Sequence, residues 1–195
     1  MTELKKRKYN NTLRSQKSDS TTVHIIETYV HMLAAAKGSE VQIQDLALKA
    51  KVSERTIFRF FKDKKALHEA TDSYIQRYLD SSLQLIEKNS FLGFVQKSFL
   101  LFEEHHDLML AYMFSPYGIK ARAVFRKQLN EILISQILKE KKLKLSKNNK
   151  YKLSVIVSLV NVKIWYDLKN DFIMSGPEIS QSMSWAIESL LDQLS

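Results

Sequence analysis

The sequence predicts an all-α protein, with a small N-terminal three-helix domain followed by a larger helical body, about nine helices in total. Two observations predict this fold class. Apolar residues recur at helical spacing along most of the chain. Only 4 of the 195 residues are Gly and 2 are Pro, so few positions can interrupt a helix or form a hairpin turn. We expect a basic flexible arm at residues 1–20, a compact domain at residues 21–70 and an all-helical body at residues 71–195.

The composition is typical of a soluble protein, with 45% hydrophobic and 26% charged residues. The absence of Cys excludes disulfides and thiolate metal sites, and it fits a reducing cytoplasm. The longest uncharged apolar-rich run, residues 153–162, is about half of the roughly 20 residues that span a bilayer. No apolar run follows the basic N-terminus, as a signal peptide requires. We therefore expect a cytoplasmic protein without a membrane partner.

The net charge of +9 is concentrated near the N-terminus. Up to His68 the chain has 14 Lys and Arg against 7 Asp and Glu, whereas the remainder has 16 against 14. This asymmetry favours a polyanionic partner for the N-terminal domain. The alternative is a basic protein whose charge serves only its solubility.

Three helices are predicted in the N-terminal domain. The first, Thr21–Lys37, has an apolar stripe that can pack across two shorter helices, which share Ile43–Leu67. Ser53 lies in the polar joint between these two and is a good N-cap for the second. This second helix has a buried apolar side and a cationic, hydrogen-bonding outer side. The pattern therefore predicts a helix-turn-helix that can place its second helix in a DNA major groove.

The same stretch resembles the DNA-binding domain of TetR-type (tetracycline-repressor family) transcriptional regulators. The resemblance is carried by Leu46-Ala47, Ala50-Lys51-Val52-Ser53, Thr56-Ile57-Phe58-Arg59-Phe60-Phe61 and Lys64-Lys65-Ala66-Leu67, and it covers roughly a quarter of the chain. The chain departs from the family at Lys51, where Gly is usual, at Phe58, where Tyr is frequent, and at Phe60, where His is frequent. A left-handed backbone at Lys51 costs about 1 kcal/mol relative to Gly.

The resemblance implies that Ser53–Phe61 is a recognition helix. Arg55 and Arg59 are expected to read guanine edges, because a guanidinium can donate two hydrogen bonds to O6 and N7. Thr56 is expected to contact a thymine methyl group or a phosphate, and Glu54 a cytosine amino group. Phosphate anchors are expected from the start of the preceding helix and from the helix that follows. The predicted DNA-contacting residues are Gln42, Gln44, Ser53, Glu54, Arg55, Thr56, Phe58, Arg59 and Lys64.

In the body, the predicted helices continue to the C-terminus. They run from Lys64 to about Lys88, over Phe91–His106 and Leu108–Phe114, from about Ala121 to Ile137, over Tyr151–Asn170 and over Ile179–Leu194. The segment Tyr151–Asn170 is apolar on nearly every side, which predicts a buried helix with partners on both sides. Asp63 is expected to cap the helix from Lys64, and Ser175 with Glu178 has the spacing of a capping box.

The resemblance also implies a homodimer on a palindromic operator. We expect the interface to form from Tyr151–Asn170 and Ile179–Leu194, because a two-fold dimer doubles the base contacts of one domain. The predicted interface residues are Val155, Leu159, Val162, Met183, Ile187, Leu190 and Leu191.

Family bodies commonly enclose an effector pocket. Thioethers beside aromatic rings can accommodate a small apolar or aromatic effector. The predicted lining is Met109, Tyr112, Met113, Phe114, Phe125, Trp165 and Tyr166. The alternative is that these residues form ordinary core.

An enzyme is not expected, because the sequence contains no Gly-rich phosphate loop, nucleophile elbow or Cys. Glu103–Asp107 is the one cluster of ligand-type residues, and adjacent side chains on a helix diverge. No metal or cofactor is predicted. The function predicted is a ligand-responsive repressor that binds double-stranded DNA. The alternative is a DNA-bound adaptor whose body docks a partner protein.

Overall fold

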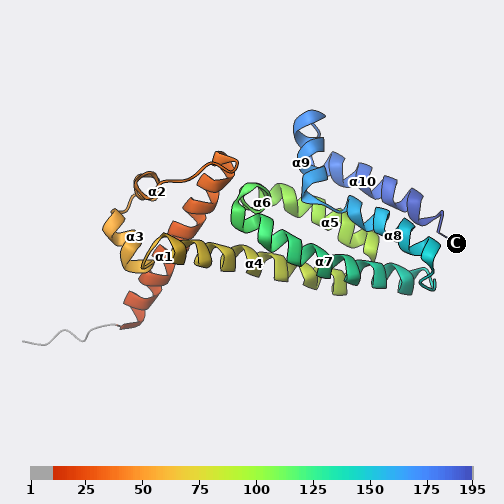
Figure 1. Cartoon of the computed structure of the whole chain (residues 1–195), viewed down its shortest axis with the longest axis horizontal. Coiled ribbons are helices and arrows are strands. Elements are labelled where there is room, and N and C mark those ends of the chain that lie inside the picture. The colour runs from red at the N-terminus through yellow and green to blue at the C-terminus, as the bar shows by residue number, and fades with distance from the viewer. Residues whose placement is uncertain (1–10, 195) are drawn as a thin grey trace, which may run out of the picture.

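The computed structural model describes the backbone of residues 11–194, and the side chains of all of these except residues 11–18, 82, 116–117 and 120–121. Figure 1 shows a small N-terminal bundle and an elongated body, joined by one long helix. The described residues form ten helices and no strand, which confirms the all-α fold class: α1 (Asn11–Ala36), α2 (Ile43–Lys49), α3 (Glu54–Phe60), α4 (Lys64–Lys88), α5 (Phe91–Glu104), α6 (His106–Phe114), α7 (Pro116–Glu140), α8 (Lys147–Leu159), α9 (Val162–Asp171) and α10 (Gly176–Leu191).

The first helix is longer than its apolar stripe predicted. It begins at Asn11 instead of Thr21, so the expectation of a flexible arm is wrong for residues 11–20, and residues 1–10 lie outside the described part of the chain. No Gly or Pro occurs between Asn11 and Ala36 to stop the helix.

The N-terminal bundle is built on a small apolar core. Ile25 of α1, Leu46 of α2, Ile57 of α3 and Leu67 of α4 are all 1% exposed or less. One fully buried residue from each of four helices fixes their mutual angles, because protein interiors are close-packed. A hydrogen bond of 2.8 Å between the Tyr29 hydroxyl and a ring nitrogen of His68 further joins α1 to α4.

The long helix α4 connects the bundle to the body. The Asp63 side chain accepts a hydrogen bond from the Ala66 amide at 2.8 Å, which confirms the predicted cap. A second connection runs beside it, since α1 also packs against α6. A ring nitrogen of His31 on α1 contacts a carboxylate oxygen of Asp107 on α6 here. The position of α6 in the body is therefore tied directly to the helix that supports the helix-turn-helix.

The prediction of a single helix over Tyr151–Asn170 is wrong, because the chain breaks between α8 and α9. Val160 leaves helical geometry with a ψ of 82°. The Asn161 side chain then accepts a hydrogen bond from the Lys163 amide at 2.9 Å and starts α9. The pattern that is apolar on every side therefore belongs to two helices with different buried faces.

The body core is formed largely by α5, α6, α7 and α10. Every residue from Leu108 to Met113 is buried, and α10 packs along α5. Ser175 donates its backbone N–H to a Glu178 carboxylate oxygen at 2.8 Å, so the predicted Glu178 half of the capping box is present at the start of α10. Among the described residues, no helix combines the length and the apolar character needed to cross a bilayer.

Candidate nucleic-acid interface and body cavity

The turn between α2 and α3 is tight and has a left-handed residue. Lys51 has a φ of 54°, as the replacement of the usual Gly suggested. The Val52 amide donates to the Ala47 carbonyl at 3.0 Å, which closes the turn by a bond typical of a helix C-terminus. A ring nitrogen of His24 on α1 lies 3.1 Å from the Ala50 carbonyl and holds this turn against the first helix.

Ser53 caps α3 as predicted. Its hydroxyl accepts a hydrogen bond from the Thr56 amide at 3.1 Å. The Thr56 hydroxyl lies 2.9 Å from the same oxygen, so the two hydroxyls form a local pair at the start of the helix. These contacts satisfy an amide that would otherwise lack a partner, and they fix where α3 begins.

The helix α3 separates an apolar inner side from an exposed outer side. Ile57 is 1% exposed and Phe61 closes the inner side behind it. The outer side presents four of the predicted DNA-contacting residues, Glu54, Arg55, Phe58 and Arg59. Neither arginine forms an ion pair with a described carboxylate, although the Arg59 guanidinium stacks 4.9 Å from the centre of the Phe60 ring. Cationic side chains therefore remain available on an outward face.

The predicted phosphate anchors differ in their surroundings. Gln42 and Gln44 are exposed at the start of α2. Lys64 forms an ion pair with Glu40, whose carboxyl pKa is lowered by the Lys64 ammonium. Much of the Lys64 charge is therefore already matched within the protein. Sequence spacing alone did not indicate this contact, because 24 residues separate the partners.

Three further exposed lysines flank the two short helices and were not among the predicted DNA contacts. These are Lys49, Lys51 and Lys62, and none forms an ion pair with a described carboxylate. Their charge was visible in the sequence, but their exposure depends on the packing of α2 and α3 against α1. They add to the cationic character of the domain.

The ligand-type residues Glu103–Asp107 are distributed among separate contacts. Glu103 accepts from the Trp165 indole N–H at 3.2 Å and pairs with Lys169, while the His105 ring packs on Tyr78. A ring nitrogen of His106 lies 3.0 Å from an Asp107 oxygen. Within the described chain, no three His, Asp or Glu residues gather as metal ligands do.

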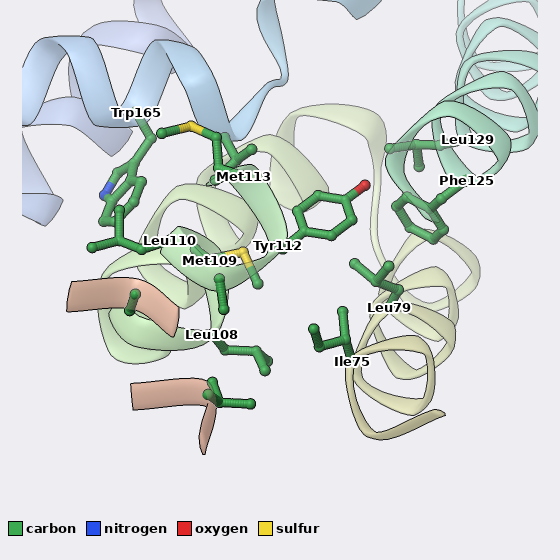
Figure 2. Packing of buried hydrophobic residues seen from close by; sticks show 14 of the residues in the cluster. Ile75, Leu79, Leu108, Met109, Leu110, Tyr112, Met113, Phe125, Leu129 and Trp165 are labelled. Atoms are coloured by element: carbon green, nitrogen blue, oxygen red, sulfur yellow. The ribbon is translucent and has the colours of Figure 1, made fainter. Parts of the chain in front are cut away.

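A cavity lies inside the body, with walls from α4 to α7 and the start of α9. The space open to the centre of a water molecule is about 50 Å³. Three of the seven predicted pocket residues line it: Met109, Tyr112 and Phe125. Figure 2 shows the Tyr112 ring between α6, which carries it, and the side chains of Phe125 and Leu79. Two lining residues that the sequence did not indicate, Arg122 and Arg126, project from α7.

The other four predicted pocket residues lie elsewhere. Met113, Phe114 and Tyr166 line a more open groove on the outside of the body. Trp165 is 0% exposed and belongs to the solid core, where its ring contacts Phe102 and His106. Trp165 lines neither the cavity nor the groove, so its part in an effector pocket stays a prediction.

The predicted interface residues also differ in whether they are buried or exposed. Val162, Met183, Ile187 and Leu191 are at most 7% exposed and pack inside the body, so they form no surface for a partner. Leu159 and Leu190 are half-buried, and Val155 is 56% exposed. Exposed apolar residues missed by the sequence analysis are Tyr151 on α8 and Trp185 on α10. A helical stripe shows which residues share a face, but not whether that face meets the same chain or another.

Residues 31–71 match the family model described as "Bacterial regulatory proteins, tetR family". The fold is similar to the 1.54 Å crystal structure of a proposed TetR-family transcriptional regulator from Mesorhizobium loti MAFF303099, with a TM-score of 0.52, 16% sequence identity, and coverage of 90% of this chain and 96% of that chain. A TetR transcriptional regulator from Rhodococcus sp. RHA1 gives a TM-score of 0.46 at 16% identity, covering 93% of this chain and 99% of that one. No curated protein matches the chain in sequence.

Proposed function

We propose that the protein is a TetR-type, ligand-responsive repressor that binds a palindromic operator as a homodimer, and the match of residues 31–71 to the tetR family model supports this proposal. At the level of the family, the protein is a DNA-binding transcriptional regulator. The observation that carries the proposal is the outer face of α3, where Arg55 and Arg59 are exposed and unpaired with any described carboxylate.

Different residues of the DNA-binding domain have different roles in the proposal. Arg55 and Arg59 read guanine edges through paired hydrogen bonds. Lys49, Lys51 and Lys62 contact phosphates and contribute affinity without base discrimination. Lys64 contributes less than these three, because Glu40 already neutralises part of its charge.

The first test is to recover genome fragments with the purified full-length chain at about 150 mM salt, and then to footprint the strongest fragment. A protected inverted repeat is the expected result. Uniform binding without a preferred site would show that the protein binds DNA without sequence specificity. On the protected site, Arg59→Ala is expected to cost about 1–3 kcal/mol and relax one base position, whereas Lys62→Ala weakens all sequences alike. Equal losses for both variants on specific and random DNA would contradict these roles.

Exposed apolar residues on α8 and α10 support the proposed dimer. Val155 and Tyr151 project from α8 at 56% and 63% exposure, and Trp185 projects from α10 at 71%. The two helices pack against each other within the chain, and Figure 1 shows both at the edge of the body. Aromatic residues are enriched at interface cores, where burial stabilises association.

Light scattering at micromolar concentration tests the dimer. The wild type is expected to have twice the chain mass, and Val155→Glu or Trp185→Glu is expected to shift it toward the monomer. Val124→Glu is the matched control, because Val124 is 75% exposed on α7, a helix outside the proposed interface. A monomeric wild type would refute the dimer.

The contact between α1 and α6 supports a response to ligand. The helix α6 lines the cavity with Met109 and Tyr112. It also packs against α1 of the DNA-binding bundle. A ligand that shifts α6 therefore shifts the orientation of the bundle, which changes the spacing of two recognition helices in a dimer. The adaptor alternative is favoured by the exposure of Phe172 and Ile173, at 69% and 81%, after α9.

A further inference from the structure

We propose that the body cavity binds a small carboxylate with an apolar tail or ring, and that Arg122, Arg126 and Tyr112 hold its charged end. The inference rests on the proposed function, since it names the chemical class of the ligand for the same cavity. It departs from the neutral apolar or aromatic effector that the sequence suggested. The chemical groups that line the cavity support this inference.

Most of the wall is apolar. Leu79, Phe94, Leu101, Phe102, Met109 and Phe125 supply aliphatic, aromatic and thioether surface. Such a wall favours a hydrocarbon body, because the removal of apolar surface from water is favourable. A strongly hydrated dianion such as phosphate would leave most of this wall without a suitable partner.

The polar side of the wall carries positive charge without any matching negative charge. The Arg126 guanidinium donates to the Val160 carbonyl, and to the Val157 carbonyl at 3.4 Å. Arg122 donates to the Met113 carbonyl at 3.0 Å. No lining residue is acidic, and neither arginine forms an ion pair with a carboxylate in the described part of the chain. Each guanidinium has five N–H donors, so donors remain for a ligand.

Tyr112 adds a donor that the protein does not satisfy. Its hydroxyl oxygen is buried and has no hydrogen-bond partner in the structure. Burial raises the pKa of Tyr112 to about 12, although the nearby Arg122 and Arg126 lower it in part, so the phenol keeps its proton at neutral pH. A buried polar group without a partner destabilises the fold. A carboxylate oxygen would accept this proton in a hydrogen bond and remove this destabilisation.

The three groups lie around one cavity and are within electrostatic reach of each other, since both guanidinium charges act on Tyr112. Hydrogen bonds between ionised partners are roughly twice as strong as neutral ones. An alcohol of the same shape can accept the same bonds but supplies no charge. The site therefore discriminates in favour of the anion.

The size of the cavity restricts the ligand. The space of about 50 Å³ is smaller than the roughly 150 Å³ cavity that admits benzene, so a ring-sized ligand requires a side chain to move. Met109 is the side chain suited to this, because an unbranched thioether has several accessible rotamers. We expect short aliphatic acids to enter most easily, followed by single aromatic rings.

Isothermal titration calorimetry on the full-length chain tests the inference with two matched pairs, butanoate with 1-butanol and benzoate with benzyl alcohol. At least one carboxylate is expected to bind about tenfold or more tightly than its alcohol. Arg126→Gln and Tyr112→Phe are expected to reduce this preference about tenfold and about fivefold, because each variant weakens the carboxylate more than the alcohol. Lys127→Gln is the matched control, because it removes an exposed cation one residue further along α7.

Arg122→Gln provides a second variant in case the loss of Arg126 unfolds the end of α8, and circular dichroism checks each fold. An alcohol that binds as tightly as its carboxylate, or an equal effect of Lys127→Gln, would overturn the inference. Absence of carboxylate binding up to about 1 mM would also overturn it. The operator footprint without ligand is scored separately. A protected operator with no carboxylate binding refutes only the ligand class, whereas carboxylate binding without a protected operator refutes only the proposed regulator.

Discussion

Lys51 is one of four described non-Gly residues with a positive φ, and it occupies the turn of the helix-turn-helix. An L-residue with a side chain is strained there by about 1 kcal/mol relative to Gly. We expect Lys51→Gly to raise the free energy of unfolding by about 0.5–1 kcal/mol, as measured by urea denaturation. Lys49→Gly is the control of opposite sign, because Lys49 is helical. Equal signs for the two variants would refute the assignment of strain to Lys51.

Asp107 links the DNA-binding bundle to the body and predicts a pH dependence. Burial raises the pKa of its carboxyl, but hydrogen bonds from His106 and His31 outweigh this effect and hold the pKa below its ordinary value of 3.8. Because the folded-state pKa is the lower one, the carboxylate stabilises the fold above about pH 4. This contribution disappears as the pH falls through the lowered folded-state pKa.

Asp107→Asn is therefore expected to lower stability at pH 7 and to flatten the stability profile below about pH 4. The side chain is 42% exposed, so solvent screening limits the effect to about 1 kcal/mol or less. Thermal denaturation from pH 3 to 7 measures both changes. Asp171→Asn, which removes an exposed carboxylate at the end of α9, serves as the comparison. If stability changes equally for both variants as the pH falls below about 4, the His31–Asp107 contact is not the cause of the pH dependence.

At the scale of elements, the close approach of α6 and α7 depends on Gly118. A Cβ atom at this position would lie 2.2 Å from the Tyr112 carbonyl oxygen, which belongs to the backbone and is not free to turn aside. We expect Gly118→Ala to lower the free energy of unfolding by about 2–3 kcal/mol. Gly93→Ala is the matched control, because its nearest neighbour is the Ser90 hydroxyl at 3.3 Å. Helix propensity favours Ala over Gly, so Gly93→Ala is expected to lose little or no stability. Similar losses for the two variants would contradict the steric conflict between α6 and α7.

The break between α8 and α9 was not predicted, because the sequence indicated one continuous helix over this stretch. Caps at Ser53 and Asp63 were predictable because each acts on an amide three residues away. The break at Val160 was not, since no Gly or Pro marks it. Arg126 from α7 binds the Val160 carbonyl at this point, so a distant residue satisfies a backbone group that the helix end leaves free.

At the scale of the whole molecule, the uneven charge determines how DNA binding responds to salt. Lys62 is exposed and unpaired with any described carboxylate, so its contact with a phosphate would release about one counterion. We expect Lys62→Gln to reduce the slope of log affinity against log salt by about 1, on specific and random DNA alike. Fluorescence anisotropy across a salt series measures this slope. Lys127→Gln, on the body, is the control, and an unchanged slope for Lys62→Gln would remove Lys62 from the interface.

The sequence by itself determined the helix-turn-helix, its caps at Ser53 and Asp63 and the left-handed turn at Lys51, because these depend on residues within a few positions of one another. The sequence also predicted that Arg55 and Arg59 of the recognition helix are exposed, since the polar side of an amphipathic helix faces solvent. Only the tertiary structure decided which apolar stripes are core and which are surface, as Met183 and Trp185 on α10 show. The cavity likewise depends on the packing of helices far apart in the chain, which is what places Arg126 beside Tyr112.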